Sequence, residues 1–202
     1  MRRTAEDAAQ TRQDILDAAL MVFSRKGYHA TRLADIADAA DVTRGAIYHH
    51  FGNKPKLYQA LLDEAASLGG NVIQDAIAHA NSFVETCTLI LINSLSFLEQ
   101  NEQMRQITEL SLFKTGIDLE LVEMEQTRQE QAVQMVAGIA QFMKQGIASG
   151  ELRADLDPTD VARSFIAFQN GIIHLWLSNP QAFSIKADAP KFANIFLQGI
   201  VK

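Results

Sequence analysis

A short stretch of the chain gathers side chains that can hydrogen-bond to phosphates and to base edges. The outward face of one predicted helix carries Thr43, Arg44, Tyr48 and His49. The next predicted helix begins with Lys54. An arginine can donate two hydrogen bonds to one guanine, and hydroxyl groups can bind phosphate oxygens beside the positive end of a helix dipole. Gly45 leaves room for a close backbone approach. These residue types favour contact with double-stranded DNA.

Two short helices must hold these side chains. We expect one from about residue 32 to residue 40, with Thr31 as its N-cap, and a second over residues 44–50, capped by Thr43. The three residues 40–42 form the turn between them. This length and spacing match a helix-turn-helix unit, whose second helix fits the DNA major groove. Periodicity alone leaves a second interpretation open, a plain helical hairpin with a polar surface.

Further helices flank this unit. A helix over residues 9–26 carries an apolar stripe and ends at Gly27, and Asn53 caps a fourth helix that begins at Lys54. The pair Gly69-Gly70 predicts a kink or break in that helix. Later helical segments are expected at residues 83–99, 102–114, 119–148, 158–177 and 189–201. Since no run alternates with period two, we predict no strands and an all-α fold.

Composition indicates a globular chain with an uneven charge. Its 202 residues are 48% hydrophobic and carry a net charge of −6. Residues 1–58 contain nine Lys/Arg and seven Asp/Glu (+2), so the remainder carries −8. We predict a DNA-binding domain at 1–58 and a second domain at 59–202. A single cysteine excludes an internal disulfide, and the lack of a signal peptide or a long apolar run predicts a cytoplasmic protein without membrane contact.

The string VTRGAIYHHFGNKPKLY, residues 42–58, resembles the signature of the TetR/AcrR family of bacterial regulators. The positions that match it are Thr43, Gly45, Ile47, Tyr48, His50, Phe51, Lys54 and Leu57. Upstream matches are Ile15, Ala18, Phe23, Gly27, Thr31, Ile36 and Ala37. The resemblance implies phosphate contacts at Thr31, Thr43, Tyr48, His49 and Lys54 and a base contact at Arg44. It assigns Ile47, Phe51 and Leu57 to the core.

The last two predicted helices are strongly apolar. Their apolar positions at helical spacing are Phe165, Phe168, Ile172, Leu175, Trp176, Phe192, Ile195, Phe196 and Ile200. Such helices can pair with their copies in a four-helix bundle, and the resemblance implies this homodimer. Internal packing of the same stripes is the alternative. Reading two half-sites about 34 Å apart requires a dimer.

Polar residues inside apolar helices indicate a ligand pocket, because such pockets are mostly apolar with a few polar groups. Glu109 and the pair Gln169-Asn170 fit this pattern. Residues 112–124 and 167–183 also resemble the subgroup that represses multidrug efflux pumps. On that register the candidates are Ile90, Leu91, Thr108, Glu109, Leu112, Ile166, Gln169, Asn170 and Ile173.

The sequence therefore predicts a repressor that a hydrophobic small molecule releases from a palindromic operator, controlling a multidrug efflux system. A regulator of a metabolic operon that answers one metabolite is the alternative. A helical-bundle enzyme is the distant alternative, because no nucleotide-binding, hydrolase or zinc-protease motif occurs. We expect no cofactor and no metal. Cys87 lies in an apolar run and is expected to be a buried small side chain.

Overall fold

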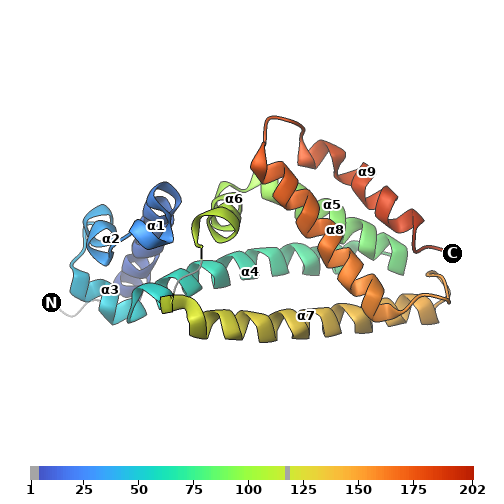
Figure 1. Ribbon diagram of the computed structural model, residues 1–202, viewed down its shortest axis with the longest axis horizontal. Helices are drawn as coiled ribbons and strands as arrows, with labels where there is room; N and C mark the ends of the chain where they lie inside the picture. The colour runs from blue at the N-terminus through green and yellow to red at the C-terminus, as the bar shows by residue number, and fades with distance from the viewer. Residues whose placement is uncertain (1–4, 117–118) are drawn as a thin grey trace. The chain divides into compact units, whose positions relative to one another are not determined.

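The computed structural model describes residues 5–116 and 119–202, and these residues are almost entirely helical. The helices are α1 (Ala5–Ala30), α2 (Leu33–Ala39), α3 (Arg44–Phe51), α4 (Lys54–His79), α5 (Phe83–Gln100), α6 (Glu102–Glu109), η1 (Leu110–Lys114), η2 (Leu119–Leu121), α7 (Val122–Ala148), α8 (Pro158–Ser178) and α9 (Ile185–Gln198) (Figure 1). Within the described ranges the one extended pairing is an isolated bridge between Leu152 and Val201. The predicted all-α class is confirmed. Residues 117–118 of the segment 112–124 lie outside the described residues.

The chain divides into two compact units. The N-terminal unit comprises Met1–Ser67 with Gln103–Glu125, and the C-terminal unit comprises Leu68–Glu102 with Gln126–Lys202. Helices α4 and α7 therefore contribute residues to both units. The domain boundary after Tyr58, which concerns DNA binding, stays a prediction.

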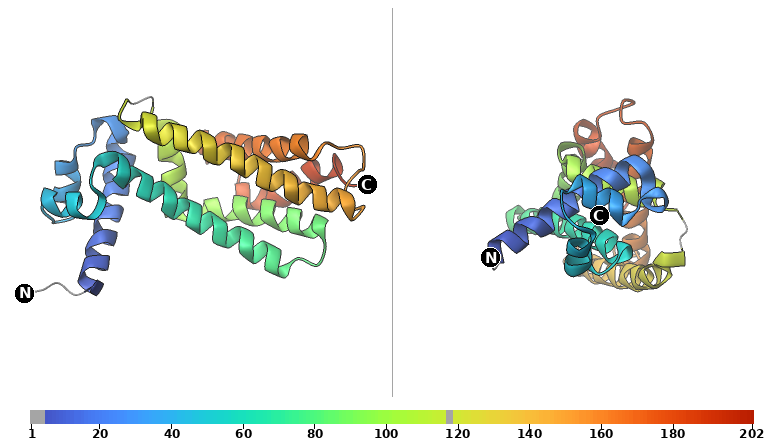
Figure 2. Two further views of the ribbon diagram at one scale, coloured as in Figure 1. Left: turned by 90° about the horizontal axis from the view of Figure 1, so that it is seen from below. Right: turned by 90° about the vertical axis from the view of Figure 1, so that its left-hand side faces the viewer.

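The core of the N-terminal unit forms where α1, α2 and α3 pack, as the views of Figure 2 show from two further sides. The predicted stripe of α1 is buried, including Ile15 and Phe23, and it meets Ile36 of α2 and Ile47 of α3. Burial of each such side chain contributes about 1.5–3 kcal/mol. The rings of Phe23 and Tyr28 stack inside this core with their centroids 5.5 Å apart.

Gly27 interrupts α1 as predicted. Its φ of 78° and ψ of 164° are not helical, and a β-carbon built there would lie 3.2 Å from the carbonyl oxygen of Lys114. A residue with a side chain would be strained at this φ. The close approach by the segment around Lys114 adds a second reason for glycine.

Two predicted caps are confirmed and one is wrong. The Thr43 hydroxyl accepts a hydrogen bond from the backbone N–H of Ala46, and the Asn53 side chain accepts one from Lys56. The cap of α2 is Arg32, not Thr31. The Thr31 hydroxyl instead donates to the carbonyl of Gly27 at 2.7 Å, because the turn after Gly27 brings that carbonyl within reach.

Two other boundaries differ from expectation. Helix α4 runs without a break through Gly69-Gly70, so the predicted break is wrong: at each glycine the lost side chain costs only about 1 kcal/mol in helix propensity. Helix α9 begins at Ile185 rather than near Ala189, because the Ser184 hydroxyl accepts a hydrogen bond from the N–H of Ala187 and caps it there. Pro190 then lies inside the helix.

The C-terminal unit is built around α5, which packs against α8 and α9 (Figure 1). Glu151, in the turn after α7, accepts hydrogen bonds from the first backbone N–H groups of α5, those of Phe83 and Val84. These N–H groups have no partner within the helix, so a carboxylate from a distant segment fixes the start of α5.

Candidate nucleic-acid interface and ligand cavity

Helix α3 presents one face to solvent and buries the other. Ile47 and Phe51 are buried in the core of the N-terminal unit. Side chains on the opposite face are exposed: Thr43, Arg44, Tyr48 and His49, with Gly45 beside them. The sequence predicted this division, and it leaves arginine, hydroxyl and imidazole groups together on a helix narrow enough for a major groove.

The hydroxyl group of Thr43 can donate its proton to a ligand while its oxygen caps α3. Its oxygen accepts the N–H of Ala46 at 3.2 Å, so the cap bond does not use the hydroxyl proton. A hydroxyl can accept and donate at once. Thr43 can therefore cap α3 and donate to a phosphate oxygen at the positive end of the helix.

Lys54 lies at the start of α4, and its ammonium is held by an aromatic ring. The Lys54 Nζ atom lies 4.1 Å from the centroid of the buried Tyr28 ring, a cation–π contact. Arg12 of α1 similarly lies 5.1 Å over the ring of Phe51. Neither Tyr28 nor Arg12 was predicted to have such a role, because no spacing in the sequence links either of them to its partner.

The remaining candidates differ in exposure. The rings of His49 and His50 lie edge to face at 5.3 Å, with His49 outward. Thr31 is 2% exposed and its hydroxyl proton is donated to Gly27, so its side chain has little to offer a phosphate. In the structure, Thr31 stabilises the turn between α1 and α2 through this hydrogen bond. Its contact with DNA stays a prediction.

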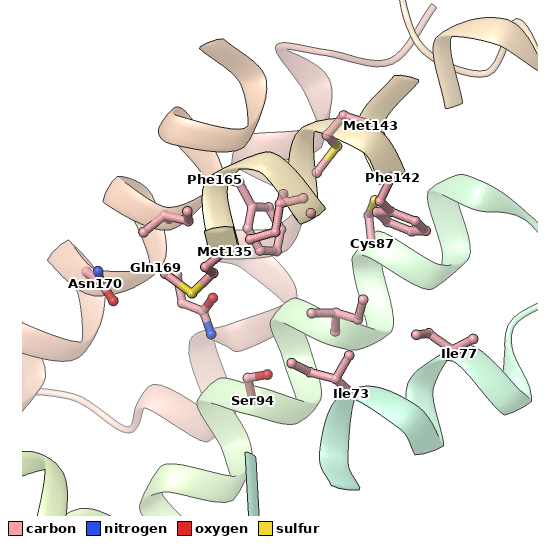
Figure 3. A pocket seen from close by; sticks show the side chains of 14 residues that line it. Ile73, Ile77, Cys87, Ser94, Met135, Phe142, Met143, Phe165, Gln169 and Asn170 are labelled. Atoms are coloured by element: carbon pink, nitrogen blue, oxygen red, sulfur yellow. The ribbon is translucent and has the colours of Figure 1, made fainter. Parts of the chain in front are cut away.

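A cavity of about 400 Å³ lies within the C-terminal unit, between α4, α5, α7 and α8 (Figure 3). It is lined by Ile73, Ile77, Cys87, Ile90, Ser94, Met135, Gly138, Ile139, Phe142, Met143, Phe165, Ile166, Gln169 and Asn170. Four predicted pocket residues are among them: Ile90, Ile166, Gln169 and Asn170. A mostly apolar wall with a few polar groups suits a small molecule.

Other predicted pocket residues do not line this cavity. Leu91 is fully buried in the core, and Ile173 lies half-buried on α8. The three candidates around α6, Thr108, Glu109 and Leu112, belong to the N-terminal unit. None of these three lines the cavity of the C-terminal unit.

Two of the α6 candidates have polar partners nearby in the sequence. The Thr108 hydroxyl donates to the carbonyl of Met104, and Glu109 forms a 2.7 Å ion pair with Lys114. The segment Leu110–Lys114 is wound as a π-helix, which shifts side chains relative to a regular α-helix. Leu112 is exposed there. A role for these residues in ligand binding stays a prediction.

The part of the wall that α4 and α7 supply was not predicted from the sequence. On α7 the lining residues Met135, Ile139, Phe142 and Met143 follow helical spacing. That apolar stripe was the available signal. On α4, Ile73 and Ile77 are one turn apart and complete the same cavity.

Cys87 is buried in the cavity wall. Burial, followed by the nearby negative charge of Glu151, raises the pKa of its thiol to about 12. The thiol therefore stays protonated at neutral pH and is a poor nucleophile. This agrees with the expected small buried side chain.

Two further kinds of feature are absent from the described residues. No cluster of three or more His, Cys, Asp or Glu side chains that could hold a metal ion occurs in residues 5–116 and 119–202. In the same part of the chain, no helix combines the length and apolar character needed to cross a membrane.

Comparisons with family profiles and with individual proteins identify the same kind of protein, a bacterial transcriptional regulator. Residues 15–61 match the profile of bacterial regulatory proteins of the tetR family, and residues 84–201 match the C-terminal region of MAATS-type transcriptional repressors. The HTH-type transcriptional regulator TtgR of Pseudomonas putida is 32% identical over 195 residues, covering 96% of this chain and 93% of TtgR. AcrR of Shigella flexneri is 31% identical over 198 residues, covering 98% and 92%.

The fold comparison agrees with this result. The crystal structure of NalD, the secondary repressor of the MexAB-OprM multidrug efflux pump in Pseudomonas aeruginosa, matches with a TM-score of 0.83 at 25% identity and covers 98% of both chains. The family resemblance seen in residues 42–58 is thereby confirmed, and the similarity extends over nearly the whole chain. This protein belongs to the TetR family of bacterial transcriptional regulators.

Proposed function

We propose that this protein represses a multidrug efflux system and that a hydrophobic small molecule releases it from its operator. The observation that carries the proposal is the pairing of an exposed, polar α3 face with a largely apolar cavity in the other unit. The names of similar proteins support it, since NalD is described as a repressor of a multidrug efflux pump. In this role the protein acts in the cytoplasm and needs no catalytic residue.

DNA contact divides into positioning and reading. Thr43, Tyr48, His49 and Lys54 contact phosphates, and Gly45 allows the backbone to approach the DNA. Arg44, exposed at the first position of α3, reads a guanine. Phosphate contacts fix the register of the helix but carry no sequence information. Arg44 is therefore the residue on which base preference depends.

A palindromic operator requires two copies of α3. Helices α8 and α9 each leave a large apolar side chain exposed, Leu175 at 64% and Ile195 at 61%. A homodimer through these two helices covers both side chains and presents the two recognition helices to half-sites about 34 Å apart.

The effector acts by preferring one state of the dimer. Helix α4 begins at Lys54 and contributes Ile73 and Ile77 to the cavity wall. A ligand that fills the cavity shifts the equilibrium only by its difference in affinity between the DNA-binding state and the released state.

A gel-shift assay tests the proposal. The purified protein is mixed with DNA from upstream of its own gene and its divergent neighbour, with and without a panel of hydrophobic compounds. We expect a specific shift that some compound reverses. A shift reversed by one metabolite of a neighbouring operon would favour the alternative regulator, and no specific shift at any salt concentration would refute the repressor.

A further inference from the structure

We infer that the cavity selects uncharged aromatic ligands that carry one hydrogen-bonding group, and that it rejects cations and anions of the same shape. The inference rests on the proposed function, since it names the class of effector for that cavity. It follows from the residue types of the wall and from the hydrogen bonds that occupy the nearby charges.

The wall of the cavity is electrically neutral. None of the fourteen residues that line it in the described part of the chain is Asp, Glu, Lys, Arg or His. An ion that leaves water for such a site loses its hydration without gaining a counter-charge, and this cost is large. A neutral ligand of the same size does not meet that penalty.

Two carboxylates on segments beside the wall, Glu151 and Asp75, already have partners. Glu151 is close enough to Cys87 to raise its pKa, but its two oxygens accept the N–H groups of Phe83 and Val84. On α4, Asp75 is exposed and lies 3.2 Å from His79. Neither carboxylate lines the wall, so neither is placed to form a direct ion pair with a cation inside the cavity.

The polar groups of the wall gather toward one end. In Figure 3 the side chains of Ser94 and Gln169 lie on one side, whereas Cys87, Phe142 and Met143 lie on the other. The helix rise agrees, because seven residues of α5 from Cys87 to Ser94 span about 10 Å. A ligand with an apolar body and one polar end fits this division.

Of the three polar side chains of the wall, Asn170 is exposed, whereas Ser94 and Gln169 are half-buried and can serve a hydroxyl or a carbonyl of the ligand. A serine hydroxyl donates and accepts, and a glutamine amide offers two donors and one acceptor. Phe142 and Phe165 supply aromatic surface for the body of the ligand. Phenols and aryl amides match both requirements.

Most of the exposed residues that line the cavity are also apolar. Ile73, Ile77 and Met135 are exposed although they are large and apolar. A ligand therefore meets apolar side chains before it reaches the interior. This entrance offers a charged ligand no attraction at short range.

The test uses three compounds of one shape: 4-phenylphenol, biphenyl-4-carboxylate and 4-phenylbenzylammonium. Binding to the full-length protein is measured by calorimetry and by the fluorescence of its single tryptophan, Trp176 of α8. We expect the phenol to bind at least about 100-fold more tightly than either ion. Equal binding of an ion, or no binding of the phenol, would overturn the inference.

A charge placed in the wall should invert the preference. Gln169→Glu adds a carboxylate at the polar end, so the affinity for the ammonium compound should rise about tenfold or more relative to the phenol. The control, Gln141→Glu, adds the same charge at an exposed residue of α7 outside the wall and should leave the ratio unchanged. An unchanged ratio in Gln169→Glu would count against a role for this end.

A second variant covers the case in which Gln169→Glu does not fold. Gln169→Leu should weaken 4-phenylphenol about tenfold and leave biphenyl, which lacks the hydroxyl, within about twofold. Equal loss of both compounds would overturn the hydrogen-bonding role. Operator binding without ligand is measured separately, so loss of DNA binding refutes the proposed function while the compound series still decides the inference.

Discussion

The hydroxyls of Tyr58 and Thr115 are joined by a buried hydrogen bond of 2.7 Å that links α4 to the residue after η1. Thr115 also donates its own hydroxyl proton to the carbonyl of Leu110 at 2.9 Å. A hydroxyl has only one proton to donate. Tyr58 is therefore the donor to Thr115, and the three groups form a directed chain inside the N-terminal unit.

This direction predicts unequal effects for the two partners. Tyr58→Phe removes one donor and leaves Thr115 paired with Leu110, so it should lower the free energy of unfolding by about 0.5–1.5 kcal/mol. Thr115→Val leaves the buried Tyr58 hydroxyl without an acceptor and should cost about 1–3 kcal/mol for that group alone. Urea unfolding followed by circular dichroism measures both.

The control for this pair is Thr11→Val. The Thr11 hydroxyl donates to the carbonyl of Asp7 within α1, at an exposed place in the same unit. Its loss should change stability by about 0.5 kcal/mol or less. A larger loss in Tyr58→Phe than in Thr115→Val would contradict the assigned direction.

A second prediction separates base reading from charge. Arg44→Ala should cost about 1–3 kcal/mol of specific binding and relax base preference at one position in each half-site. Arg44→Lys keeps the charge but loses the two-pronged donor, so it should lose discrimination while retaining most of the salt dependence. Binding to operator variants at several salt concentrations provides the measurement. Intact discrimination in Arg44→Ala would show that another residue reads the base.

Lys54 is expected to act differently from Arg44. Lys54→Ala should weaken binding about equally on all sequences and reduce the slope of binding against salt by about one. Lys144→Ala removes the same charge from an exposed residue of α7 in the C-terminal unit and should leave the slope unchanged. A loss of base preference in Lys54→Ala would contradict its phosphate role.

Much of the N-terminal unit could be predicted because its signals are local. Thr43 and Asn53 cap helices within three residues of the N–H groups that they accept. The alternation of buried Ile47 and exposed Tyr48 follows from helical period alone. The predicted N-cap at Thr31 was wrong because its hydroxyl donates to the carbonyl of Gly27, four residues earlier. This bond is as local as a cap, and the sequence does not distinguish the two.

The cavity was harder to predict because its wall is assembled from distant segments. Ser94 and Met135 lie on different helices, and no sequence spacing shows that both face one space. The candidates Thr108, Glu109 and Leu112 do not line this cavity, and the π-helix Leu110–Lys114 in their segment has no simple sequence mark. Gln169 and Asn170 could be predicted as lining residues because polar residues in an apolar helix are recognisable from the local sequence.

The proposed dimer gives a fourth prediction. Leu175→Asp places a charge at the exposed apolar face of α8 and should convert a dimer to a monomer at micromolar concentration, measured by light scattering after gel filtration. Val133→Asp is the matched control, since Val133 is 71% exposed and belongs to α7, not to either terminal helix. If Val133→Asp dissociates the dimer and Leu175→Asp does not, the interface involves α7 instead.

The last prediction concerns Glu151 and acid stability. The N–H of Val84 is the main cause that holds the pKa of Glu151 below its ordinary value of 4.5, and the N–H of Phe83 and the Ser149 hydroxyl add to it. The folded protein therefore keeps this carboxylate ionised more readily than the unfolded chain does. Its contribution to stability is complete above pH 4.5 and is lost as the pH falls through the lower folded value.

Glu151→Gln should remove this pH-dependent part. The urea midpoint of the wild-type protein is expected to fall more steeply than that of the variant as the pH drops from about 6 to about 3.5. Glu130→Gln, at an exposed residue of α7, serves as the control and should follow the wild-type curve. If Glu151→Gln instead parallels the wild type over this range, the carboxylate does not stabilise the start of α5 through its charge.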